Sequence, residues 1–115
     1  MISLKENRSL SKKEKLLLKK CKEVIKDVDH SAEVILYGSR ARGDANNNSD
    51  YDLLILVDGE MSLEREDFIC RQLYPIELET GKVLSAFVFS RMEWDTPLYR
   101  SIPLHKSINI EGVIL

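Results

Sequence analysis

Two short apolar runs separated by a polar connector constrain the fold of this chain more than any other feature. Residues 33–37 (EVILY) form a short run with β-branched and aromatic residues that stops at Gly38, and residues 51–57 (YDLLILV) are nearly continuously apolar. Such runs are typical of buried strands. The connector, residues 38–50, is rich in Gly, Asn, Asp and Ser, and its NNNS stretch has strong turn chemistry. We therefore expect two core strands joined by a surface loop, where functional side chains gather.

An amphipathic helix is predicted before the first strand. From Ser11 to about Val28 apolar residues recur at helical spacing, and Ser11 with Glu14 forms a capping-box pattern. The predicted apolar stripe consists of Leu17, Cys21, Val24 and Val28, flanked by Leu18 and Ile25. The opposite face carries seven lysines. This pattern fits either a solvated face or a contact with an acidic partner, and both interpretations stay open.

Helix and strand patterns also follow the second run. Residues 62–79 have helical spacing that Pro75 should kink or break, and residues 83–89 are a third strand candidate. Residues 97–107 suggest a final helix in which Pro103 is unfavourable. The order helix, strand, loop, strand, helix, strand, helix predicts an α+β domain. Its small mixed sheet of three or four strands should be flanked by helices.

Length and charge narrow the class of protein. The 115 residues, 43% hydrophobic and 31% charged, predict one domain over residues 1–115. A domain this small buries a modest share of its surface, which favours extra burial in a homo-oligomer. The net charge of −2 argues against a protein that coats nucleic acid. Cys21 and Cys70 are expected to be free thiols, and the absence of a long apolar run predicts a cytoplasmic protein without a membrane span.

The connector and the start of the following strand contain the best candidates for functional residues. Asp50 and Asp52 stand two positions apart at the start of a strand, so both carboxylates should lie on one face. Paired carboxylates repel unless a cation lies between them, and Mg²⁺ typically binds one or two carboxylates plus phosphate oxygens. Gly38 permits a sharp turn that brings backbone amides toward a phosphate, and Ser39 adds a hydroxyl. The pattern predicts a site that binds a polyphosphate together with a metal ion.

The two arginines of the connector leave two interpretations open. Arg40 and Arg42 could add positive charge for a polyphosphate, or they could form ordinary surface ion pairs. A P-loop is excluded despite the spacing of Gly38 and Gly43, because Asp44-Ala45 replaces the required Lys-[Ser/Thr].

These residues resemble the nucleotidyltransferase fold of the DNA polymerase beta superfamily, and specifically its minimal members. Their hallmark is Gly-Ser, a later Gly and then Asp-x-Asp, represented here by Gly38, Ser39, Gly43, Asp50 and Asp52. The resemblance spans roughly residues 34–57. It implies transfer of a nucleoside monophosphate from a nucleoside triphosphate, such as ATP, to an acceptor hydroxyl. It also implies Asp50 and Asp52 as catalytic ligands of Mg²⁺ or Mn²⁺, with Gly38 and Ser39 at the phosphates.

One departure from the family pattern leaves two functional classes open. Members that catalyse transfer usually carry a third carboxylate on a later strand, but residues 82–89 (KVLSAFVF) contain none. Glu77 and Glu79 lie upstream and do not match the family's position. In the first class the chain is an active transferase, paired with a helical HEPN-type partner in a toxin and antitoxin pair. In the second it binds nucleotide or protein and regulates by occupancy. The acceptor, including a nucleic acid, stays open.

Overall fold

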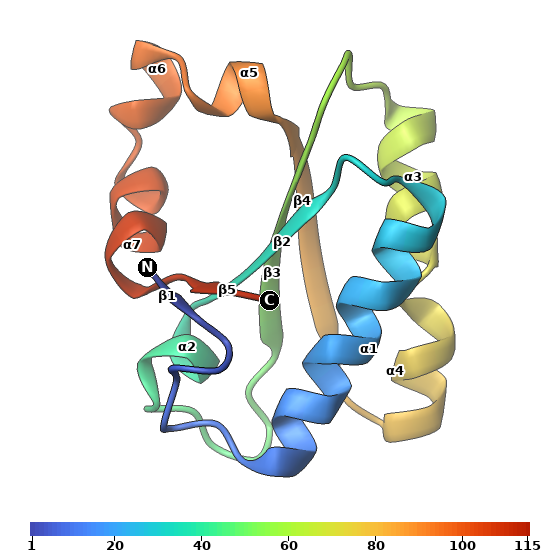
Figure 1. The fold of residues 1–115 in the computed structure, drawn as a ribbon, viewed down its shortest axis with the longest axis vertical. Coiled ribbons are helices and arrows are strands. Elements are labelled where there is room, and N and C mark those ends of the chain that lie inside the picture. The colour runs from blue at the N-terminus through green and yellow to red at the C-terminus, as the bar shows by residue number, and fades with distance from the viewer.

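A computed structural model describes residues 1–115, and Figure 1 shows one mixed sheet between two groups of helices. The sheet has five strands in the spatial order β1-β5-β2-β3-β4. The two central strands, β2 and β3, are antiparallel, whereas β3 and β4 are parallel. The strands are β1 (Ile2–Ser3), β2 (Glu33–Tyr37), β3 (Tyr51–Val57), β4 (Leu84–Ser90) and β5 (Val113–Ile114).

The helices divide between the two faces of this sheet (Figure 1). One face, which we call the closed face, is covered by α1 (Lys12–Val28), α3 (Leu63–Arg71) and α4 (Tyr74–Thr80). The other, the open face, is covered only in part by α5 (Arg91–Trp94), α6 (Pro97–Arg100) and α7 (Pro103–Glu111). The short α2 (Ser39–Arg42) follows β2 directly. No helix is both long enough and apolar enough to cross a membrane.

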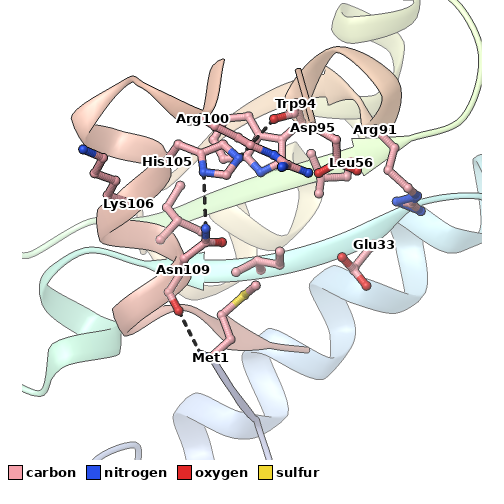
Figure 2. Close-up of a pocket in the computed structure, with 12 residues that line it drawn as sticks. Met1, Glu33, Leu56, Arg91, Trp94, Asp95, Arg100, His105, Lys106 and Asn109 are labelled. Atoms are coloured by element: carbon pink, nitrogen blue, oxygen red, sulfur yellow. Dashed lines mark hydrogen bonds between the residues drawn. The ribbon is translucent and has the colours of Figure 1, made fainter. Parts of the chain in front are cut away.

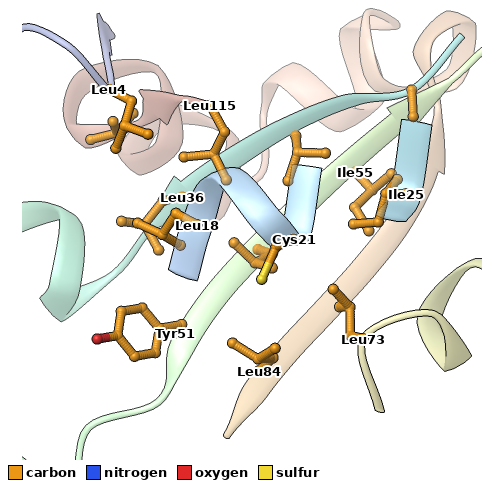
Figure 3. Packing of buried hydrophobic residues seen from close by; sticks show 14 of the residues in the cluster. Leu4, Leu18, Cys21, Ile25, Leu36, Tyr51, Ile55, Leu73, Leu84 and Leu115 are labelled. Atoms are coloured by element: carbon orange, nitrogen blue, oxygen red, sulfur yellow. The ribbon is translucent and has the colours of Figure 1, made fainter. Parts of the chain in front are cut away.

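The closed face contains the main hydrophobic core (Figure 3). Alternation along β3 sends Leu53 and Ile55 to this face, where Leu18, Cys21 and Ile25 of α1 cover them. The cluster has 20 buried residues, against 6 on the open face, so most apolar burial lies on one side of the sheet. Since burial of apolar surface is the dominant stabilising term, this face supplies most of the folding free energy.

Local sequence signals account for where α1 begins, and tertiary packing decides which stripe it buries. The Ser11 hydroxyl accepts from Glu14 N, and the Glu14 carboxylate accepts from Ser11 N, which confirms the predicted capping box. The predicted stripe was displaced by about one position. Leu18, Cys21 and Ile25 are fully buried, while Val28 is exposed, because β2 and β3 contact the helix on that flank.

The three- or four-stranded sheet was an underestimate. The additional strands, β1 and β5, have two residues each and pair with one another in parallel. Two residues are too short to give a recognisable alternation, so only tertiary pairing defines them, that of β5 with β2 and that of β1 with β5.

The prolines act at helix beginnings rather than inside helices. The predicted helix over 62–79 is two helices, and the break falls before Pro75, which lies in the first turn of α4. The helix expected over 97–107 also divides, and Pro103 begins α7. Proline is favoured in a first turn because its missing N–H is not needed there.

Candidate active site

The turn after β2 brings the backbone against the carboxylate of Asp52. Gly38 has φ 75° and ψ −159°, a conformation that L side chains rarely adopt. A Cβ atom at this position would collide with the Asp52 carboxylate. This closeness follows from strand register, because Tyr37, the residue before Gly38, is the partner of Asp52 on β3. A glycine is therefore required here for two separate reasons, its positive φ and the space that Asp52 occupies.

The four residues after Gly38 form α2, a single short turn of helix. Ala41 N donates to Gly38 O at 3.1 Å, and Gly43 ends the helix with φ 85° while its N–H donates to Ser39 O at 3.0 Å. No protein group hydrogen-bonds the hydroxyl of Ser39, which is partly exposed. Ser39 thus keeps a donor available beside the turn.

The two aspartates lie where β3 begins, on the open face. Asp50 is exposed and accepts a hydrogen bond at Oδ2 from Ser85 Oγ at 3.3 Å. Asp52 is partly buried. Burial raises the pKa of Asp52, and the negative charge of Asp50 raises it further, while Arg42 acts in the opposite direction. The structure therefore brings the two carboxylates into electrostatic contact, at a point that favours a cation.

Arg40 turns away from the carboxylates and holds the connector in place. Its Nη2 donates to Ser49 O at 2.9 Å and its Nη1 to Glu14 Oε2 at 3.3 Å. The guanidinium carbon lies 4.4 Å from the centre of the Tyr51 ring, and Tyr51 points to the closed face. These contacts link α1, the connector and β3, so Arg40 positions the loop that ends in Asp50.

Arg42, in contrast to Arg40, lies near the two aspartates. Its Nε donates to Asp44 Oδ2 at 3.1 Å and its Nη1 to Glu111 Oε2 at 3.0 Å, and about half of its side chain is exposed. Glu111 ends α7 and also raises the pKa of Asp52 through its charge. Arg42 therefore joins the end of α7 to the turn beside the aspartates. Sequence reasoning missed Glu111, because nothing local relates it to residues so distant along the chain.

The strand beside β3 carries a hydroxyl where a carboxylate could stand. Ser85 is the register partner of Asp52, so their side chains share the open face. The two glutamates upstream are engaged elsewhere. Glu77 accepts from Leu84 N at 3.0 Å, and Glu79 pairs with Lys20 at 3.0 Å. Ser85 was also missed by sequence reasoning, since only the parallel register of β3 and β4 places it against Asp50 and Asp52.

The donor chemistry of the pair fits a hard divalent cation that shares its ligands with a substrate. No third His, Cys, Asp or Glu side chain joins Asp50 and Asp52 in a metal-binding group. Two carboxylates suffice for Mg²⁺ when phosphate oxygens and water supply the other ligands. The residues present therefore fit a cation delivered with a polyphosphate better than a permanently held one.

A separate cavity lies at the far end of the open face (Figure 2). It encloses about 450 Å³ between β2, β3 and the α5–α7 segment, and its lining includes neither aspartate. His105 belongs to its wall and is buried. Its ring stacks on Trp94 at 4.4 Å, Nε2 donates to Trp94 O at 3.0 Å and Nδ1 accepts from Asn109 at 3.3 Å. His105 therefore anchors α7 to α5.

Comparison with known proteins agrees with the fold. The profile of the nucleotidyltransferase domain family matches residues 17–108, which is more than half of the chain. A search of curated proteins found no match. This chain belongs to the nucleotidyltransferase domain family. The match includes β2, the connector, β3 and β4, so it contains both aspartates and Ser85.

Proposed function

We propose that this domain binds a nucleoside triphosphate with Mg²⁺ or Mn²⁺ and transfers its nucleoside monophosphate to an acceptor hydroxyl. The observation that carries the proposal is the contact between the Gly38 turn and Asp52, which puts backbone amides and a carboxylate pair at one point. Asp50 and Asp52 would hold the cation, which when bound neutralises the triphosphate and the leaving pyrophosphate. The turn residues Gly38, Ser39 and Gly43 would hold the phosphates.

Each of the two arginines has its own task in this proposal. Arg42 is half exposed and paired with two carboxylates, so it can exchange a carboxylate for a phosphate oxygen. Arg40 is buried and already donates hydrogen bonds to connector carbonyls and to Glu14 of α1. We therefore propose direct substrate contact for Arg42, and an indirect role for Arg40 through the position of Asp50.

The absence of a carboxylate base on β4 favours a second candidate function. An acceptor oxygen attacks the α-phosphorus, the bond to the β-phosphate oxygen breaks, pyrophosphate leaves, and the hydroxyl proton needs an acceptor. Strand β4 offers Ser85 at the position opposite Asp52, and a neutral hydroxyl is a poor base. This favours a domain that binds nucleotide and regulates, or one whose partner supplies the missing group. By resemblance to minimal family members, we propose a helical HEPN-type protein as that partner.

Calorimetric titration with each nucleoside triphosphate, with and without Mg²⁺, tests binding, and release of pyrophosphate in the same samples tests turnover. We expect metal-dependent binding that is lost in Asp50→Asn with Asp52→Asn. A matched control, Asp67→Asn with Asp95→Asn, removes two exposed carboxylates elsewhere and should bind normally. Equal binding by both double variants would contradict the assignment of the site.

The variant Ser85→Asp separates the two candidate functions. It places a third carboxylate beside Asp50 and Asp52, on the same face and in the same register. A large rise in pyrophosphate release would mean that the domain binds its substrate productively and lacks only a base or ligand. Unchanged release, with binding intact, would favour regulation by occupancy or a partner that supplies the acceptor.

A further inference from the structure

Strand β4 forms an edge of the sheet, and its own residues carry none of the usual protective features. Natural edge strands carry charges, prolines or bulges that prevent pairing with another chain. The seven residues of β4 (LSAFVFS) include no charge and no proline. Phe87, in the middle of the strand, is 53% exposed, and Val83, just before it, is 52% exposed. Such an edge is a ready template for an additional strand.

The hydrogen bonds of β4 identify which of its backbone groups face outward. Val83 O accepts from Tyr51 N at 2.9 Å, so the odd-numbered residues direct their backbone groups to β3. The even-numbered residues therefore direct theirs to the free edge. Two contacts agree with this, because Glu77 accepts from Leu84 N at 3.0 Å and Cys70 Sγ lies 3.9 Å from Ala86 O.

The centre of this edge has unused hydrogen-bonding capacity. Ala86 N–H, Val88 N–H and Val88 O face outward, and no group of this chain pairs with them. Strand pairing would satisfy these groups with good geometry. The edge thus has donors and an acceptor at the positions an antiparallel partner would need.

We propose that β4 pairs with β4 of a second copy of this chain, antiparallel and about a two-fold axis at Phe87. The two Phe87 side chains would face each other, with their Cβ atoms about 4.5–5.5 Å apart, as directly opposed residues in antiparallel strands are. Ala86 N–H of each copy would donate to Val88 O of the other, and Val88 N–H would donate to Ala86 O, which within one chain is contacted only by the thiol of Cys70, a weak donor. The two sheets would become continuous, and both candidate active sites would lie on the same face.

Self-complementarity is the reason for a second copy rather than an unrelated strand. A two-fold axis at Phe87 puts core-facing residues beside core-facing residues and open-face residues beside open-face residues. It also sets Lys82 of one copy beside α5 of the other, where Glu93 lies, and neither side chain has an ion-pair partner within one chain. Tyr74 of α4, which lines a groove together with Cys70 and Glu77 beside this edge, is more than half exposed and would gain cover.

Sedimentation and light scattering of the purified chain test the proposal. We expect twice the 13.2 kDa of one chain. Phe87→Lys puts two like charges face to face across the axis and should weaken dimerisation about tenfold or more. The control Leu63→Lys changes an 86% exposed apolar residue away from the edge and should dimerise as the parent does. A parent that stays monomeric at its highest soluble concentration, or a dimer indifferent to Phe87→Lys, would overturn the proposal.

Disulfide trapping locates the contact and does not depend on how well Phe87→Lys folds. Phe87→Cys should form a disulfide-linked dimer under mild oxidation, because each residue faces its own copy across the axis. Leu63→Cys and the parent, which contains only Cys21 and Cys70, should not. A parent dimer that is trapped through Leu63→Cys and not through Phe87→Cys would place the interface on another surface. The inference does not rest on nucleotide transfer, so failed nucleotide binding leaves it standing.

Discussion

The two faces of the sheet differ in what they contribute to the protein. The closed face buries a cluster of 20 residues beneath α1, α3 and α4, whereas the open face buries 6 and leaves Asp50 and Phe87 exposed. Paired carboxylates destabilise a fold through mutual repulsion and desolvation. Because apolar burial is concentrated on the other side, the open face can carry this unfavourable pair. The main hydrophobic core and the candidate site therefore lie on opposite faces of one sheet.

The largest effect should come from damage to the closed face. Ile55→Ala removes a fully buried side chain and should destabilise the domain by about 2–5 kcal/mol. Phe87→Ala, on the open face, should lower the unfolding stability of the monomer by less than about 1 kcal/mol, because half of that side chain is in water in a single chain, so both variants are compared at concentrations below those of dimerisation. Urea unfolding of both variants measures the difference. Similar losses would show that the open face contributes more to folding than the burial pattern indicates.

Removal of the two carboxylates should weaken nucleotide binding without lowering the stability of the fold. Asp50→Asn with Asp52→Asn should weaken metal-dependent nucleotide binding by about a hundredfold or more, which corresponds to about 2.7 kcal/mol. The unfolding midpoint should stay the same or rise slightly, since two repelling charges are gone. Calorimetry and thermal unfolding of the same preparations give both quantities. A clear drop in the midpoint would mean that the pair has a structural task.

Two glycines with positive φ provide a matched test of the turn after β2. Gly38 and Gly81 both have positive φ, but only at Gly38 would a Cβ meet other atoms. Gly81→Ala should cost about 1 kcal/mol of strain, and Gly38→Ala should cost more, because Asp52 must also move. Nucleotide binding should fall only for Gly38→Ala. Equal effects on binding would separate the turn from the site.

The smallest effect should come from the polar link between α1 and β3, and it should depend on pH. Burial opposes ionisation of Glu14, but hydrogen bonds from Ser11 N and Tyr51 and the charge of Arg40 outweigh it, so the pKa of Glu14 is lowered. A carboxylate with a lowered pKa in the folded state stabilises the protein above its unfolded pKa of about 4.3, and this contribution disappears as the pH falls through the folded value.

Glu14→Gln keeps the capping pattern and removes the charge. We expect it to destabilise the domain by about 1 kcal/mol at pH 7 and to approach the parent's stability near pH 3. Urea unfolding across this range tests the expectation. A constant difference at every pH would contradict the role of the charge.

Sequence patterns predicted the elements with strong local signals. Strands β2 and β3, the capping box of α1 and the turn at Gly38 all follow from short-range spacing and from backbone preference. The two-residue strands and the exact start of α4 and α7 were not predictable in this way. They depend on contacts with β2 and on prolines that begin helices rather than break them.

The residues of the candidate site also fall into a group that was predictable from local sequence and a group that was not. Gly38, Ser39, Asp50 and Asp52 were recognisable because their chemistry and spacing lie within one short segment. The inward turn of Arg40, the hydroxyl of Ser85 and the carboxylate of Glu111 were not. Arg40 reaches a residue 26 positions away, Ser85 one 35 away and Glu111 one 69 away.

By itself, therefore, the sequence determined that this chain would build a strand, a glycine turn and a carboxylate pair two residues apart. Periodicity and backbone preference act over a few residues, so they can be read without coordinates. The tertiary structure alone decided that Ser85 opposes Asp52, that Arg42 joins α7, and that β4 ends the sheet unprotected. Those outcomes depend on strand order and register, which are settled only when distant segments compete to bury the same apolar surface.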